Sequence, residues 1–407
     1  MGEPEVDGAG GQGARVPRKT TGVIYLDHNA STPIAPEVRE AMLPYLEEGY
    51  GNPSSTHWAG APAAEAVSGA RAKLAEVLGC APAEVVFTSG GTEANNTALK
   101  GVVEASGVAR PHLVVSAVEH PAIVEPCRHL ERHGAEVTYV PVDGTGLVDP
   151  DDVARAVRPE TVLVSVMHAN NEVGTIEPIA EISRVAREAG VLVHTDAAQS
   201  VGKVPTRVDD LGVDLLSVAA HKFYGPKGVG ALYVRAGTRL ESLMHGAGHE
   251  SGRRAGTENV LLDVGLGAAA QLAGDLAWTR RVLALRDWVW ARLHELYGHQ
   301  VVLNGHPTER LPNTLNVSFV GGDGREILAA MPEVAASTGS ACHSGGTEPS
   351  PVLAAMGVPR DVGAGAVRLS LGRSTTQGEL ERLLDRLIDV VPPPHAPARH
   401  TSQGGGP

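Results

Sequence analysis

Short apolar runs alternate with amphipathic segments along most of the chain, and this alternation limits the possible folds more than any other feature. Residues 63–78, for example, carry Val67, Ala70 and Leu74 on one helical face, and Gly79 suits the position after a helix end. Strands that alternate with helices build a mostly parallel sheet flanked by helices. The sequence therefore predicts an α/β fold. The strand-like runs lie at 85–88, 112–116, 161–167, 191–195 and 215–218.

Length and a change of pattern near residue 275 predict more than one packed unit. The 407 residues exceed the size at which a single core usually stops growing. We expect a large domain at 22–275 with a mostly parallel mixed sheet and a smaller α+β domain at 276–391. The ends, 1–21 and 392–407, are rich in Gly and Pro and lack apolar periodicity, so we expect disordered tails.

The expected smaller domain has its own signals. A long helix-like stretch at 278–296 precedes strand-like runs at 315–319 and 367–371. A last helix opens at Thr376, and Glu379 three residues later completes a capping box.

Composition excludes several classes of protein. Against 34 Lys and Arg stand 47 Asp and Glu, and a net charge of −13 repels polyanions, so no direct nucleic-acid binding is expected. No apolar stretch is long enough for a membrane span or a signal peptide, so we expect a cytoplasmic protein. Cys80, Cys127 and Cys342 fit neither a disulfide framework nor a metal motif, and the histidines lack ligand spacing. No resident metal is expected.

A candidate phosphate site lies where the strand at 85–88 meets a helix that begins near Thr92. Gly90 and Gly91 allow close approach of the backbone, and the free N–H groups of a first helical turn attract anions. The same spacing also fits a simple turn that Thr92 caps.

Two further segments place polar groups at the ends of apolar strands, where open α/β sheets bind ligands. Asp196 and Gln199 follow the run at 191–195; the carboxylate could keep a pyridine nitrogen protonated, or it could cap a helix. Lys222 follows the run at 215–218, where desolvation would lower its pKa and free the amine for Schiff-base chemistry. Lys227, beyond the next turn, is expected to be solvated.

These segments belong to an ordered series of motifs that resembles the cysteine desulfurase family of fold-type I, class V pyridoxal-phosphate enzymes. The resemblance covers residues 25–391, nearly the whole folded region. In chain order the motifs are GGTEANN, VEH, HANNEVGT, HTDAAQ, HKFYGPKG, RRAGT, SACHSG and RLSLGR.

The resemblance implies how pyridoxal 5′-phosphate would be held. Lys222 would form the Schiff base, Asp196 would pair with the pyridinium nitrogen, and Gln199 would hydrogen-bond the phenolic oxygen. His120 would stack on the ring and shuttle protons; without the resemblance it would pass for a solvated loop histidine.

The resemblance also implies that residues of two subunits would bind the phosphate. Gly91, Thr92 and His221 resemble its ligands within one chain, and Thr257 resembles the residue that reaches the phosphate of the neighbouring subunit. A homodimer is therefore implied.

At the substrate end the resemblance assigns Asn171 and Arg368. Asn171 would contact cofactor and substrate, and Arg368 presents a fork that matches a carboxylate, although its position alone suggests a surface residue at a strand edge. Cys342 lies among small residues that permit movement, and it would take the sulfur of L-cysteine as a persulfide, releasing L-alanine. Transfer to an acceptor protein would follow. Cys80 and Cys127 are expected to be packing residues.

Two departures from the desulfurase pattern favour the selenocysteine lyase subgroup. Ala219 occupies the place where many desulfurases have a phosphate-binding Ser, and His343 follows Cys342 where Thr is common. Release of selenide from L-selenocysteine is therefore the alternative activity. A non-catalytic dimeric scaffold or an aminotransferase fits less well, because a scaffold need not keep the predicted catalytic residues and an aminotransferase leaves Cys342 unexplained.

Overall fold

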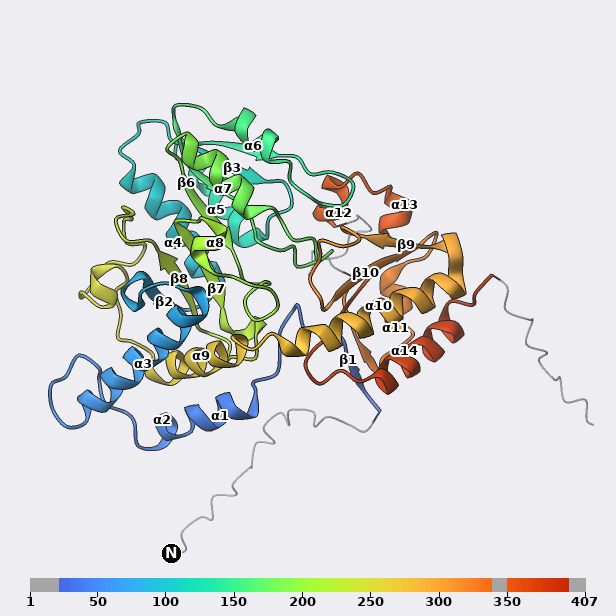
Figure 1. The fold of residues 1–407 in the computed structure, drawn as a ribbon, viewed down its shortest axis with the longest axis horizontal. Helices are drawn as coiled ribbons and strands as arrows, with labels where there is room; N and C mark the ends of the chain where they lie inside the picture. The colour runs from blue at the N-terminus through green and yellow to red at the C-terminus, as the bar shows by residue number, and fades with distance from the viewer. Residues whose placement is uncertain (1–21, 339–349, 395–407) are drawn as a thin grey trace, which may run out of the picture.

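The computed structural model describes residues 22–338 and 350–394. Cys342 and His343 lie outside the described residues, as do the expected tails apart from Pro392–Pro394. Figure 1 shows two units side by side, each with its own sheet. The α/β architecture predicted from the sequence is confirmed.

A mixed sheet of seven strands forms the larger unit, in the order β2-β8-β7-β6-β5-β3-β4. β8 pairs antiparallel with β2 and β7, and the other neighbours are parallel. The strands are β2 (Val85–Thr88), β3 (His112–Ser116), β4 (Glu136–Val140), β5 (Thr161–Ser165), β6 (Leu192–Asp196), β7 (Leu215–Ala219) and β8 (Gly230–Val234). The five strand-like runs of the sequence are confirmed to within two residues, whereas β4 and β8 were not anticipated.

Helices cover both faces of this sheet. Alternate residues of β3 point to opposite sides: Leu113 and Val115 pack with α4 and α5, and Val114 packs in the layer of α3, α7 and α9. Burial on both faces explains why the strands read as continuous apolar runs. The helices are α1 (Pro36–Met42), α2 (Pro44–Glu47), α3 (Gly60–Leu78), α4 (Gly91–Ala105), α5 (Pro121–Glu131), α6 (Pro150–Ala156), α7 (Ile179–Glu188), α8 (Val208–Leu211) and α9 (Val260–Ala273).

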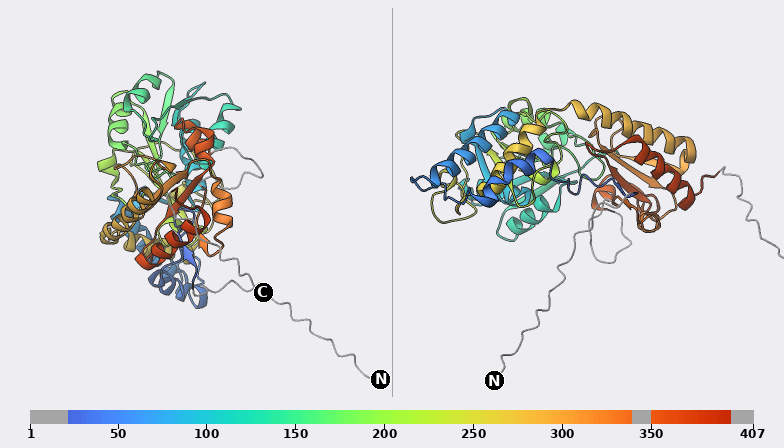
Figure 2. Two further views of the ribbon diagram at one scale, coloured as in Figure 1. Left: turned by 90° about the vertical axis from the view of Figure 1, so that its right-hand side faces the viewer. Right: turned by 90° about the horizontal axis from the view of Figure 1, so that it is seen from below.

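The smaller unit packs helices on an antiparallel sheet of three strands in the order β12-β10-β9. Figure 2 shows the long helix α10 running along this unit from its junction with the larger one. The strands are β9 (Val301–Asn304), β10 (Thr314–Phe319) and β12 (Ala366–Ser370), and the helices are α10 (Ala277–Tyr297), α11 (Gly324–Ala329), α12 (Pro351–Ala355), α13 (Arg360–Gly363) and α14 (Gln377–Val390).

The first described strand joins the smaller unit and not the larger. β1 (Ile24–Tyr25) pairs in parallel with β11 (Val334–Ala335), and Ile24 and Leu26 pack in the core that contains Val317. The sequence predicted this segment within the large domain at 22–275. The pairing with β11 leaves no local signal, because a two-residue strand carries no periodicity and its partner lies about 300 residues away.

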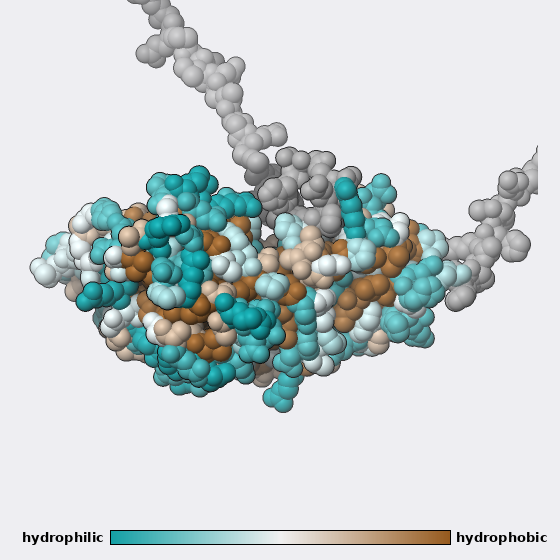
Figure 3. Space-filling model, turned by 90° about the horizontal axis from the view of Figure 1, so that it is seen from above, coloured by the Kyte–Doolittle hydropathy of each residue, from teal (hydrophilic) through white to brown (hydrophobic). Residues whose placement is uncertain are grey.

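Among the described residues, no single helix has the length and apolar character of a membrane span. α9 and α10 combine sufficient length with sufficient apolar character only as a pair, and they are bent by 72° at their junction. On the face shown in Figure 3, hydrophilic side chains cover much of the surface, with smaller hydrophobic areas between them.

Candidate active site

A cavity of about 730 Å³ lies at the carboxyl ends of the parallel strands, between the two units. This volume is typical of small-ligand sites. Ten of the eleven site residues predicted from the sequence fall among the described residues, and nine of these ten line the cavity. They are Gly91, Thr92, His120, Asn171, Asp196, Gln199, His221, Lys222 and Arg368.

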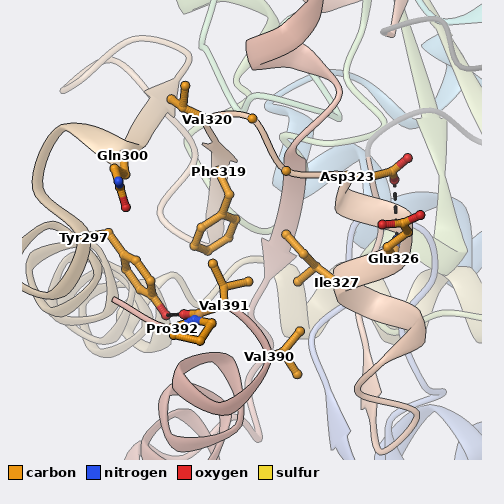
Figure 4. Close-up of a pocket in the computed structure, with 12 residues that line it drawn as sticks. Tyr297, Gln300, Phe319, Val320, Asp323, Glu326, Ile327, Val390, Val391 and Pro392 are labelled. Atoms are coloured by element: carbon orange, nitrogen blue, oxygen red, sulfur yellow. Dashed lines mark hydrogen bonds between the residues drawn. The ribbon is translucent and has the colours of Figure 1, made fainter. Parts of the chain in front are cut away.

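A second cavity, of about 480 Å³, lies in the smaller unit, and its polar side chains do not converge on one point. Its floor is formed by Tyr297, Phe319 and Ile327, and Figure 4 shows Gln300 on one side of these residues and Asp323 on the other. Polar groups that do not converge cannot bind one small ligand together. The first cavity is therefore the candidate active site.

Lys222 follows β7 and reaches the cavity from one wall. Its Nζ donates to the backbone oxygens of Asn29 (2.7 Å) and Ala30 (3.0 Å). Desolvation, helped by the nearby Arg368, lowers the pKa of Lys222 to about 8 against the opposing charges of two carboxylates. A useful fraction of the amine is thus unprotonated near neutral pH. Lys227 is exposed, as expected.

Asp196 ends β6, and its carboxylate is held from two sides. Asn95 Nδ2 donates to Oδ2 (2.7 Å), and the backbone N–H of Ala198 donates to Oδ1 (2.9 Å). The alternative role as a helix cap is wrong, because turns follow β6 and the next α-helix, α8, begins at Val208. A fixed, buried carboxylate of this kind suits a cationic ring nitrogen.

Asn29 was missed by the sequence analysis and links several site residues. Its backbone oxygen accepts from Gln199 Nε2 (2.8 Å) as well as from Lys222. Its side-chain Nδ2 donates to Thr314 Oγ1 (2.8 Å) and to the backbone oxygen of Asn171 (3.2 Å). Asn29 follows a short apolar run at 23–26, just as Asp196 follows the run at 191–195. This pattern was the available signal for a site residue.

His120 precedes α5 as its N-terminal cap and lies exposed on the cavity wall. Its Nδ1 accepts from the backbone N–H of Ala122 (3.0 Å), so a neutral ring carries its proton on Nε2. The surrounding atoms lower the pKa of His120, mainly through desolvation. The imidazole is therefore neutral at pH 7.

The predicted phosphate cradle opens α4. Gly90 has a φ of 148°, which side-chain-bearing residues rarely adopt, and a Cβ on Gly91 would lie only 3.3 Å from the Cβ of Ala219. The alternative of a Thr92 cap is wrong, since Gly90 occupies the cap position. Desolvation and neighbouring lysines lower the pKa of His221 to about 4, so this ring is neutral and can donate a hydrogen bond.

Thr257 is the one described site residue that does not line the main cavity. It lines a separate cavity of about 180 Å³ with Ser89, Arg254 and Asp263. A single chain therefore does not bring Thr257 to Lys222.

Arg368 belongs to the smaller unit and forms the wall of the cavity opposite Lys222. It is only 5% exposed, which shows that the interpretation as a surface residue at a strand edge is wrong. Its Nη2 pairs with Asp27 Oδ1 (2.7 Å), and its Nη1 donates to the backbone oxygen of Asn171 (3.0 Å). Its buried Nε has no hydrogen-bond partner among the described residues. Asp27, like Asn29, was missed.

These residues fit pyridoxal phosphate. The cavity joins a lysine amine of lowered pKa, a fixed carboxylate, a neutral histidine and a glycine turn at a helix N-terminus. Those groups match the aldehyde, the pyridine nitrogen, the ring and the phosphate, respectively. The fold and site thus define a class of pyridoxal-phosphate enzyme, and a family model described as aminotransferase class V matches residues 24–383. The chain belongs to this family, which uses pyridoxal phosphate.

Its relatives narrow the assignment. The chain is 49% identical over 373 residues to a cysteine desulfurase IscS of Dictyoglomus turgidum, covering 90% of this chain and 94% of the relative. Within class V the chain is thus an enzyme of the cysteine desulfurase family.

Solved structures agree with this assignment. A NifS-like protein matches with a TM-score of 0.85 at 37% identity, over 90% of this chain and 99% of that one. The structure described as SspA in complex with cysteine matches with a TM-score of 0.78 at 37% identity, over 87% and 100%. The expected likeness to the selenocysteine lyase subgroup finds no support in these relatives.

Proposed function

We propose that this chain binds pyridoxal phosphate in the main cavity and converts L-cysteine to L-alanine, with Cys342 as the sulfur acceptor. The proposal rests on one observation. Lys222, Asp196 and Arg368 line the same cavity. The relative solved in complex with cysteine adds support, since it shares the fold over most of the chain.

The atoms balance with a thiol as acceptor. The Cys342 sulfur bonds to the substrate sulfur while the carbon–sulfur bond of the substrate breaks. Cys342 then carries a persulfide, and the substrate carbon takes up a proton to become the methyl group of L-alanine. Cys342 lies outside the described residues, but Ala336, Ser337 and Thr338, which precede this segment, line the cavity.

Bound pyridoxal phosphate supplies an electron sink for negative charge that develops on the substrate carbons. Lys222 would hold its aldehyde carbon covalently, which requires the unprotonated amine. Asp196 would keep the ring nitrogen protonated, and the Gln199 amide would donate to the phenolic oxygen. The neutral His120 would stack on the ring and shuttle protons, and its Nδ1 can accept one only when the hydrogen bond from Ala122 opens.

The remaining roles concern the two ends of the cavity. Gly91, Thr92 and His221 would bind the phosphate, and Thr257 would reach the phosphate of a neighbouring subunit in a homodimer. Arg368 and Asn171 would bind the substrate carboxylate. Arg368 lines the cavity, and its planar guanidinium presents a fork that matches a carboxylate.

The proposal also covers the acceptor, the location and the distinction from an aminotransferase. The persulfide would pass to an acceptor protein. Cys80 and Cys127 are free thiols, which agrees with action in the reducing cytoplasm. An aminotransferase would not need the Cys342 thiol, whereas the proposed reaction does.

The test uses purified protein loaded with pyridoxal phosphate and assayed in parallel with L-cysteine and L-selenocysteine for L-alanine. We expect turnover of L-cysteine and its loss in Cys342→Ala, while the visible absorption of the bound cofactor is kept. Turnover of L-selenocysteine alone would make the protein a selenocysteine lyase. Full cysteine turnover by Cys342→Ala would remove the role of this thiol, and a wild-type protein without a cofactor band would contradict the proposal.

A further inference from the structure

Lys203 is a buried lysine that the proposed chemistry does not use. It is only 4% exposed, and it forms no salt bridge with any described carboxylate. Burial, together with the charges of Lys222 and Arg368, holds its pKa well below the usual range. An amine buried without an acidic partner is unfavourable, so its place in the fold calls for a physical role.

The contacts of Lys203 are side-chain amide oxygens. Its Nζ donates to Gln199 Oε1 (2.7 Å), and Asn29 Oδ1 lies 3.4 Å away. Lys203 does not line the main cavity, whereas Gln199 does. Lys203 therefore lies behind Gln199 and Asn29, and its shorter hydrogen bond is to Gln199.

This arrangement fixes which end of the Gln199 amide faces the cavity. Because Oε1 points to Lys203, Nε2 points to the backbone oxygen of Asn29 (2.8 Å), which also accepts from Lys222 (2.7 Å). An amide nitrogen carries two N–H groups. One binds Asn29, and the second is left for a ligand in the cavity that Gln199 lines.

We propose that Lys203 is a positioning residue that holds the Gln199 amide with an N–H directed at the phenolic oxygen of pyridoxal phosphate. The inference rests on the proposed function. Without Lys203, Oε1 would be buried with no donor, and the Gln199 side chain would gain by turning toward water in the cavity. The phenolic oxygen would then lose its donor.

The test compares two ligands: pyridoxal phosphate and an analogue that lacks the phenolic hydroxyl. Dissociation constants for both are measured by equilibrium dialysis with the full-length wild type, Lys203→Met, Gln199→Ala and the double variant. We expect Lys203→Met to weaken pyridoxal phosphate binding about tenfold and analogue binding less than about twofold. In the Gln199→Ala background, Lys203→Met should add no further loss, because the two residues act as one unit.

Two controls separate this role from charge and stability. Lys227→Met removes an exposed charge that lowers the pKa of His221, so any loss should be equal for the two ligands. The thermal unfolding midpoint of the Lys203→Met apoprotein should stay the same or rise, because an apolar side chain replaces a buried amine.

Equal weakening of both ligands by Lys203→Met, an additive loss in the double variant, or no effect at all would overturn the inference while leaving the proposed function intact. A wild-type protein that binds neither ligand would overturn both.

Discussion

The two ends of the active-site cavity are built in different ways. The end with Lys222 and Asp196 comes from neighbouring strands β6 and β7 of one sheet, with Gly91 at the start of α4. The end with Arg368 joins three segments that are distant in the chain, since Asp27 lies 341 residues from Arg368 and Asn171 lies 197 residues from it. The first end is built mainly on the parallel strands β6 and β7, with one contribution from Asn29 after β1, and the second depends on contact between the two units.

Because of this difference, we expect changes at the Arg368 end to alter substrate specificity without altering cofactor binding. A parallel sheet brings the carboxyl ends of its strands to one edge whatever the smaller unit does. The Arg368 end exists only when both units are packed together. Substitutions at Arg368 should therefore alter substrate binding and leave the cofactor in place.

The largest effect expected from this comparison is that of Arg368→Lys. Lysine keeps the charge but lacks the planar fork for a carboxylate, so kcat/KM for L-cysteine should fall about 30-fold. The visible absorption of bound cofactor should be unchanged. Steady-state kinetics of L-alanine formation measure the first quantity, and an absorption spectrum measures the second.

Arg325→Lys is the matched control, because Arg325 also lines the cavity from the smaller unit and its guanidinium lies 3.6 Å from Asp323. It should change kcat/KM less than about threefold. Loss of the cofactor band in Arg368→Lys would show that the two ends are not independent.

The sequence predicted local features of both units well. The Thr376 and Glu379 capping box and the left-handed Gly79 after α3 are present, because such caps depend on residues within one turn. Lys222 and Asp196 were also predicted from the residues alone, since each follows an apolar strand.

Long-range features were not predictable in the same way. Asp27 and Asn29 reach the site because β1 pairs with β11, and no local pattern reveals this pairing. Arg368 was assigned only through a family resemblance, because its burial depends on the packing of Ser337 and Asp27 against β12. A single chain likewise gives no reason for Thr257 to act at this cavity.

A second, smaller effect tests the electrostatic link between the two ends. The pKa of Lys222 is lowered to about 8, so the free amine increases as the pH rises toward that value. The rate of cofactor incorporation into apoprotein should be about fivefold lower at pH 7 than at pH 8. The pKa of His221 is lowered to about 4, so this ring does not titrate in that window.

The Asp27→Asn variant makes this test specific. Asp27 raises the pKa of Lys222, so its neutralisation should move the midpoint of the incorporation profile to lower pH. Growth of the visible cofactor band from pH 6 to 9 measures both profiles. Coincident profiles for Asp27→Asn and wild type would mean that the substrate end does not influence the lysine.

The smallest effect concerns the cofactor end alone. Ala219 lines the cavity beside the phosphate cradle, where the Cβ of Ala219 would meet a Cβ on Gly91 at 3.3 Å. Ala219→Ser would add a hydroxyl at this point, and one extra hydrogen bond to phosphate should tighten pyridoxal phosphate binding about threefold. The KM for L-cysteine should not change, because Arg368 lies at the other end. Dissociation constants for pyridoxal phosphate and pyridoxal, which lacks the phosphate, would locate the effect: a gain for both ligands would place the new hydroxyl against the ring and not the phosphate.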